Sequence, residues 1–174
     1  MNSTLLDNCS FKSLLLVILF PFFIQNVNAI NIDSLLQYET TLPNDTNRVK
    51  VLNDIASIYS EDQLIKALYY AKKSYHLAEE LQFKNGIINS LLILADANDF
   101  LGRYPETQKL NFQLLNIYKG RNDLSGISST YNNIGIIHYY LSNYELSTDF
   151  TQKALDLYIQ LNDSNGISIC SNNL

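Results

Sequence analysis

Two histidines and several carboxylates are the residues of this sequence with side chains suited to acid–base or metal chemistry. A metal site needs ligands at a fixed spacing, such as two side chains four residues apart on one face of a helix. His138 has no second histidine close to it, and no cysteine or carboxylate at that spacing. We therefore interpret His138 as a packing residue, and we expect His76 to face solvent.

The carboxylates of Glu79, Glu80, Asp96, Asp99 and Asp123 could in principle act as general acids or bases. No glycine-rich phosphate loop, nucleophile elbow or metal-ligand cluster accompanies them, so we expect no catalytic residue, no cofactor and no metal. Glu79 and Glu80 are interpreted as a solvated helix face. Asp96 and Asp99 share one face of a largely apolar helix. An enzyme that uses this pair together with the packing histidine remains the weaker alternative.

The charge of the chain argues against nucleic acid as a partner. The 174 residues include 12 Lys and Arg against 17 Asp and Glu, and the net charge is −5. The sequence contains no basic cluster that could neutralise a phosphate backbone. We therefore expect no nucleic-acid partner.

The first 29 residues have the layout of a secretory signal peptide. An apolar run at Leu14–Ile24 follows a basic residue and leads to Ala29, a small residue suited to cleavage. Pro21 interrupts the run, which is about half of the roughly 20 residues that a spanning helix needs. We expect cleavage after residue 29 and export to the periplasm or the medium. Contact with a membrane is expected only through an uncleaved signal or a segment beyond Leu174.

Helices are the elements expected to position the remaining residues. Apolar residues recur at helical spacing from Leu35 onward, as at Ile55, Ile58 and Tyr59, which is typical of amphipathic helices. Cys170 is the only cysteine after residue 29, so no disulfide can form within the mature chain and helix packing must stabilise it. The fold is predicted to be all-α.

A 40-residue repeat organises these helices, because a Gly-Ile pair follows a polar turn at three places with that spacing. A fixed period of roughly 20 to 50 residues is typical of a solenoid, whose units must stack to bury their apolar faces. Asp33 is predicted to cap the N-terminus of an opening helix that covers the end of the stack. The expected segments are a capping helix at 30–46, repeats at 47–85, 86–125 and 126–165, and a truncated fourth repeat that starts at 166.

Each repeat is predicted to divide into a hairpin of two helices. The break is clearest at Leu101–Pro105, where glycine suits a helix C-terminus and proline suits the first turn of the next helix. Matching breaks are expected at Leu141–Tyr144 and at Tyr59–Gln63, where Ser60 and Asp62 are candidate N-caps.

Small residues mark the places where the two helices of a hairpin must approach closely. They are Ala56, Ala95 and Gly135, and the glycine predicts the tightest of the three crossings. Thr107 takes the place of a small alanine and adds a hydroxyl that must find a hydrogen-bond partner. We therefore expect the second repeat to be the least tightly packed.

The third repeat contains a motif that recurs, less completely, in the first two. Its members are Tyr131, Asn133-Ile134-Gly135, Tyr144 and Lys153-Ala154-Leu155, matched in part by Ile55-Ala56, Tyr59 and Ala67-Leu68 and by Leu94-Ala95, Gly102 and Tyr104. This motif resembles the tetratricopeptide repeat (TPR) in its longer form, over about residues 47–174. The resemblance implies a right-handed solenoid of antiparallel helix hairpins, a TPR-like superhelix, with a groove lined by the first helix of each hairpin.

The resemblance also implies which side chains line that groove. Position by position, they are Lys50, Asn53, Ser57, Ser60 and Glu61 in the first repeat, Asn89, Leu92, Asp96, Asp99 and Phe100 in the second, Ser129, Asn132, Ile136, Tyr139 and Tyr140 in the third, and Ile169 and Asn172 in the fourth. Asparagine can hydrogen-bond to a peptide backbone, and tyrosine gives contact area at low entropic cost. The best-known TPR grooves bind acidic C-terminal peptides through basic side chains, whereas this groove is acidic and disfavours such a partner. Simple solvation of these positions, or their cover by further repeats, is the alternative.

The sequence thus predicts an exported, noncatalytic module that binds a protein or an extended peptide across its first helices. By resemblance, exported runs of 40-residue TPRs often form the N-terminal sensory part of bacterial signalling proteins. Because the fourth repeat is cut short, we expect this chain to be the N-terminal part of such a longer protein. A freestanding periplasmic or secreted scaffold is the alternative.

Overall fold

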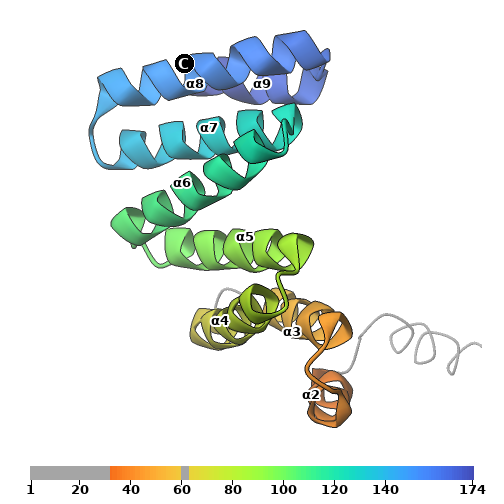
Figure 1. The fold of residues 1–174 in the computed structure, drawn as a ribbon. Coiled ribbons are helices and arrows are strands. Elements are labelled where there is room, and N and C mark those ends of the chain that lie inside the picture. The colour runs from red at the N-terminus through yellow and green to blue at the C-terminus, as the bar shows by residue number, and fades with distance from the viewer. Residues whose placement is uncertain (1–31, 60–62) are drawn as a thin grey trace, which may run out of the picture.

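The computed structural model describes residues 32–59 and 63–174, and every regular element within them is a helix. In chain order the helices are α2 (Ile32–Thr41), α3 (Thr46–Ile58), α4 (Leu64–Glu80), α5 (Lys84–Phe100), α6 (Tyr104–Gly120), α7 (Leu124–Tyr140), α8 (Tyr144–Leu161) and α9 (Ser164–Asn173). Figure 1 shows them stacked from α2 at one end to α8 and α9 at the other. The prediction of an all-α solenoid of helix hairpins is confirmed.

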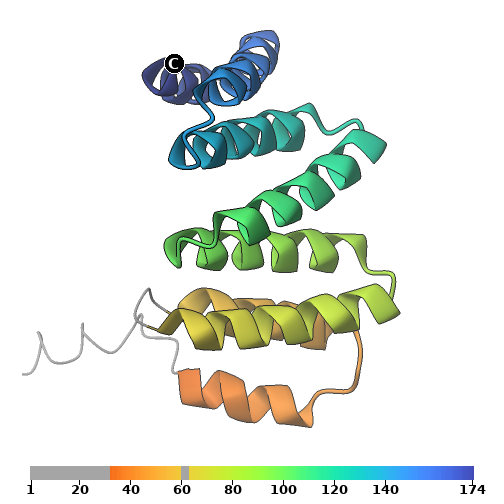
Figure 2. The ribbon, with the colours of Figure 1, turned by 90° about the vertical axis from the view of Figure 1, so that its left-hand side faces the viewer.

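The hairpins are α3 with α4, α5 with α6 and α7 with α8, and each helix also packs against the next one in the chain. First helices touch directly where α3 meets α5 and where α7 meets α9. Helices α5 and α7 make far less contact, because α6 runs obliquely between them (Figure 1, Figure 2). This separation lies between the second and third repeats.

Five connections between helices share one geometry. A residue in the left-handed conformation follows each of the helices α4 to α8, at positions 82, 102, 122, 142 and 162. In the turn between α5 and α6, Gly102 N donates to the Asp99 carbonyl at 2.8 Å and Arg103 N donates to the Asn98 carbonyl at 2.9 Å. These bonds form a Schellman motif, which satisfies the last carbonyls of a helix. The role predicted for Gly102 at a helix C-terminus is confirmed.

The repeated Gly-Ile pairs lie in the first turn of a helix, directly after the polar turns that the sequence indicated. Gly86, Gly126 and Gly166 are each the third residue of a helix, namely α5, α7 and α9. A Cβ on Gly126 would collide with the ring of Tyr118, and one on Gly166 would collide with the ring of Tyr158. Packing between consecutive helices therefore requires these glycines, and a turn conformation does not.

The N-terminal helix differs from its prediction. Asp33 lies within the first turn of α2 and is not its N-cap. Glu39 of the same helix is 4% exposed and accepts hydrogen bonds from Arg48 Nε at 2.7 Å and from Lys73 Nζ at 2.9 Å. This carboxylate ties α2 to α3 and α4. The predicted signal peptide and the candidate caps at positions 60 and 62 lie outside the described residues.

The described helices are short or interrupted by polar residues. None of them is both long and apolar enough to cross a membrane.

Candidate binding site on the first-helix face

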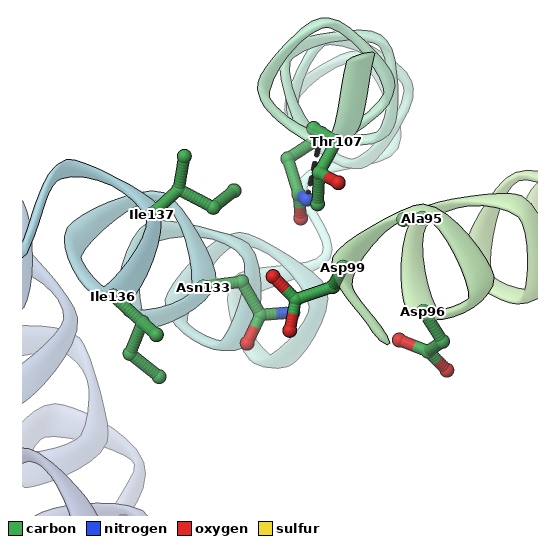
Figure 3. Close-up of a pocket in the computed structure, with 8 residues that line it drawn as sticks. Ala95, Asp96, Asp99, Thr107, Asn133, Ile136 and Ile137 are labelled. Atoms are coloured by element: carbon green, nitrogen blue, oxygen red, sulfur yellow. Dashed lines mark hydrogen bonds between the residues drawn. The ribbon is translucent and has the colours of Figure 1, made fainter. Parts of the chain in front are cut away.

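A small pocket opens between α5, α6 and α7, at the place where the two first helices are held apart (Figure 3). Its volume is about 90 Å³. Its lining consists of Ala95, Asp96 and Asp99 from α5, Thr107 and Asn111 from α6, and Asn133, Ile136 and Ile137 from α7. The structure thus brings together three of the predicted groove residues, Asp96, Asp99 and Ile136, with residues that were not predicted as part of a site.

Asn111 places an unpaired oxygen in this pocket, although its side chain is only 2% exposed. Its Nδ2 donates to the backbone carbonyl of Thr107 at 3.0 Å, the dashed bond in Figure 3. A carbonyl can only accept, so this bond fixes which end of the amide is the nitrogen. Asn111 Oδ1 then has no hydrogen-bond donor among the described residues. An unpaired buried acceptor costs roughly 1–3 kcal/mol, and a donor that enters the pocket would recover part of that cost.

The two carboxylates add negative charge beside that oxygen. Asp99 Oδ1 is buried and has no hydrogen-bond partner among the described residues. Burial raises the pKa of Asp99, while partial burial first and the charge of Asp99 second raise the pKa of Asp96, whose side chain also keeps an exposed side. None of the ion pairs among the described residues includes either carboxylate. The pocket therefore presents acceptors and negative charge that no cation of the described residues balances.

His138 lies outside this pocket, in the packing between α6, α7 and α8. Its ring stacks on Phe150 with the centroids 5.6 Å apart, and its Nε2 is 3.1 Å from Nε2 of Gln108. Burial lowers the pKa of His138, so the ring is held in its neutral form. The predicted packing role is confirmed, and His76 is exposed as expected. Within the described part of the chain, no group of three His, Cys, Asp or Glu side chains is placed to hold a metal ion.

Two predicted groove residues, Asn53 and Asn132, are buried between neighbouring first helices, at 6% and 7% exposure. Asn53 Oδ1 accepts a hydrogen bond from Ser90 Oγ of α5 at 2.9 Å. Asn132 Oδ1 accepts one from Asn173 Nδ2 of α9 at 3.0 Å. Their burial corrects the expectation that these amides face a partner. They hold successive repeats together, because a buried amide needs a hydrogen-bond partner within the stack.

Among the described residues, the other predicted groove positions keep contact with solvent, whereas Ser60 and Glu61 lie outside the described part of the chain. Ser57, Asn89, Phe100, Tyr139, Tyr140 and Asn172 are exposed, and Leu92 and Ile136 are half-buried. Tyr139 and Tyr140 belong to an aromatic patch, defined as Tyr104, Tyr139, Tyr140 and Tyr144, whose rings contact one another. Tyr140 stacks on Tyr104 with the centroids 5.0 Å apart, while Tyr139 is 59% exposed. The patch lies where α6 and α8 begin and α7 ends.

Asn111 is the pocket residue that sequence reasoning missed most clearly. Counting 40 residues backward and forward from it gives Ala71 and Thr151, and all three side chains are at most 2% exposed. A polar asparagine at a repeat position whose counterparts are buried was the signal in the sequence that could have identified this residue. Thr107 was noted only for its size, and its hydroxyl finds a partner in the Arg103 carbonyl at 3.0 Å.

Comparisons with known proteins concern the fold. No family model matches the sequence, and no curated protein matches it. Among solved structures, the apo form of RapI is similar with a TM-score of 0.72 and 16% identity, over 82% of this chain and 42% of RapI. The fold is that of a TPR-like helical repeat. BtubC (BKLC) from P. vanneervenii is similar with a TM-score of 0.57 and 19% identity, over 71% of this chain and 51% of BtubC. The chain thus spans about half of these proteins or less.

Proposed function

We propose that the protein is a noncatalytic module that binds a protein or an extended peptide across the face formed by α3, α5, α7 and α9. The observation that carries this proposal is the pocket of unpaired acceptors on this face, where the stack also exposes an aromatic patch. Unpaired acceptors are complementary to the donors of a partner, and tyrosine rings are frequent anchors in interfaces. A helical solenoid suits this role because it presents an extended surface.

A catalytic role has less support from the same geometry. The pocket of about 90 Å³ is well below the roughly 300–1,000 Å³ that is usual for small-molecule sites. Its lining includes no histidine, cysteine or serine that could act with the two carboxylates. An enzyme that combined Asp96 and Asp99 with His138 would need the imidazole beside them, and the imidazole is stacked on Phe150 instead.

The proposal is tested by selecting extended peptides from a displayed library on the full-length protein and measuring their affinity for variants. In the variant Tyr139→Ala with Tyr140→Ala, we expect the affinity to fall about tenfold or more, which corresponds to at least about 1.4 kcal/mol. The matched control is Ile65→Ala with Tyr69→Ala, which removes two side chains of α4 that are 63% and 61% exposed. Equal losses in both variants, or none in the first, would place binding elsewhere.

A second measurement, on the variant Asp96→Asn with Asp99→Asn, tests the alternative in which these carboxylates act as a general acid and base. Peptide capture should weaken while both the wild-type protein and the variant lack hydrolase activity on the selected peptides. Turnover by the wild-type protein that the double substitution abolishes would overturn the noncatalytic proposal.

We further propose that residues 1–29 direct export and that the module is the N-terminal sensory part of a longer signalling protein. The apolar run at Leu14–Ile24 supports export. A reporter enzyme that is active only outside the inner membrane, fused after Leu174, should be active, and its inactivity would refute export. A membrane helix and an output domain encoded after Leu174 would favour the sensor, and a stop codon soon after the repeats would favour the freestanding scaffold.

A further inference from the structure

We infer that the pocket between α5 and α7 binds one primary ammonium group, the end of a lysine side chain in the bound peptide. This inference rests on the proposed peptide-binding function and adds the chemical class of the partner, which is a basic segment. The site is formed by Asp96 and Asp99 on α5 and by Asn111 on α6.

Asn111, more than the pair of carboxylates, is the residue that points to a ligand. This residue lines the pocket with its side chain almost completely buried, its amide nitrogen donates to the Thr107 carbonyl, and its buried Oδ1 has no donor among the described residues. Buried polar groups in folded proteins are nearly always hydrogen-bonded, so an orphaned acceptor that lines a pocket points to a donor from outside the chain. Asp99 Oδ1 is a second orphaned acceptor in the same pocket.

The charge of the pocket selects a cationic donor. The charge of Asp99 is the second cause, after burial, of the raised pKa of Asp96. The two carboxylates therefore repel each other when both are ionised. A cation between them would relieve this repulsion and would pair with both. No ion pair among the described residues supplies that cation, because those residues pair Glu39 and Asp149 instead. A neutral donor such as a peptide N–H would leave the repulsion in place.

The size of the pocket selects the end of one side chain. A volume of about 90 Å³ has room for a few water molecules or for the end of one side chain. Ile136 and Ile137 provide apolar walls on the α7 side (Figure 3), which suit the methylene stem of lysine. An ammonium has three donors, one each for Asp96, Asp99 and Asn111, whereas a guanidinium presents five in a planar fork.

The first test uses n-butylammonium, which reproduces the end of a lysine side chain, with the full-length protein observed by NMR. Saturable shifts are expected at the side-chain amide of Asn111 and at the backbone amide of Asp99, with 1-butanol as the uncharged probe producing none. Asp99→Asn and Asn111→Leu should each weaken the binding of n-butylammonium at least fivefold. Asp54→Asn, a change at an exposed carboxylate of α3, should leave it unchanged. Shifts that do not saturate, or an affinity that is unchanged in Asp99→Asn, would show that n-butylammonium does not bind at this site and would overturn the inference.

The second test separates this inference from the proposed function. In each peptide selected on the protein, every lysine is replaced in turn by norleucine, which keeps the length of the side chain and removes its charge. One replacement should lower the affinity about tenfold or more in the wild-type protein and should have little effect in Asp96→Asn with Asp99→Asn. Peptides that bind without any preference for lysine overturn the ammonium site and leave peptide binding standing. Saturable binding of n-butylammonium with no peptide selected at all would uphold the site and remove the proposed function.

The same NMR titration is repeated with two other cations, guanidinium and calcium. Guanidinium that binds more tightly than n-butylammonium would replace lysine by arginine and overturn the inference as stated. Calcium that binds the pocket and displaces n-butylammonium at lower concentration would identify a metal site instead, and it too would overturn the inference.

Discussion

Gly135 is the residue at which the packing of the stack can be tested most directly. It lies on α7 where this helix crosses α8, within the same hairpin. A Cβ added there would be 2.5 Å from Thr151 Oγ1, 3.1 Å from the Ser147 carbonyl oxygen and 3.3 Å from Thr151 N. Only a hydrogen atom fits without movement of α8, as the sequence predicted for the tightest crossing.

The expected cost of Gly135→Ala follows from which of these neighbours can move. Thr151 Oγ1 is buried and has no hydrogen-bond partner among the described residues, so its hydroxyl can rotate without breaking a bond. The Ser147 carbonyl belongs to the backbone of α8 and cannot rotate away, so the two helices must separate by a few tenths of an ångström. Overpacking of this kind costs about 1–3 kcal/mol, and alanine recovers about 0.8–1 kcal/mol of helix propensity. We expect a net loss of about 1 kcal/mol.

Urea and thermal unfolding, followed by the helical circular dichroism signal, measure this loss. A loss of about 1 kcal/mol corresponds to a decrease in Tm of about 2–4 °C in a protein of this size, and Gly135→Leu should lower stability further. The matched control is Gly120→Ala at the end of α6, where a new Cβ has nothing within 4 Å. It should be neutral or should stabilise by up to about 1 kcal/mol. Equal or higher stability of Gly135→Ala relative to the wild-type protein would refute the close contact between α7 and α8.

A double-mutant cycle with Thr151→Ala checks the cause of the loss. Because Thr151 carries the atom nearest to the added Cβ, Gly135→Ala should cost less in the Thr151→Ala background than in the wild-type protein. Strict additivity of the two substitutions would assign the strain to the backbone of α8 alone.

Three further outcomes are expected. Asp99→Asn should raise the Tm of the free protein at neutral pH, because burial raises the folded-state pKa of Asp99 and ionisation therefore opposes folding. The gain in Tm over the wild-type protein should shrink as the pH falls and the native carboxylate takes up its proton. A gain that does not depend on pH would contradict this cause. Glu39→Gln should speed amide hydrogen exchange in α2 at neutral pH. Burial alone would raise the pKa of Glu39, but its hydrogen bonds and charge interactions with Lys73 and Arg48 outweigh burial and lower that pKa. The difference in exchange rate between the variant and the wild-type protein should therefore vanish as the pH falls through the lowered pKa. A difference that persists in acid would rule out the ion pairs as the cause. Ser142→Gly should stabilise the fold by about 0.5–1 kcal/mol in urea unfolding, because Ser142 has a φ of 60°, which glycine adopts without a Cβ clash. A loss of stability would show that the contacts of the serine side chain outweigh the strain of its backbone conformation.

Much of the fold could be predicted from the sequence because its determinants are local. Apolar spacing within one helix, the glycine at position 102 and the proline after it act over a few residues, and the 40-residue echo shows that the same unit recurs. Stability by stacking follows from that recurrence. The helix hairpins and the packing role of His138 were accessible in this way, whereas the exposure of Tyr139 and Tyr140 was expected from the resemblance to the TPR.

The site could be predicted only in part, because it depends on how neighbouring repeats sit against each other. Asn53 and Asn132 occupy groove positions by repeat register, yet the structure buries both between first helices. The same register places Asp96 and Asp99 at an open pocket, since α6 holds α5 and α7 apart.

The amino-acid sequence by itself determined that this protein is a stack of helix hairpins with an acidic and aromatic first-helix face. Only the tertiary structure decided which polar groups on that face are paired within the stack and which are left unpaired. The physical reason is that helix formation is set by residues within a few positions of one another, whereas the distance between α5 and α7 is set by side chains of three helices at once. Asn111 shows the difference, because its pattern marks it as a core position and only the packing leaves its oxygen without a donor.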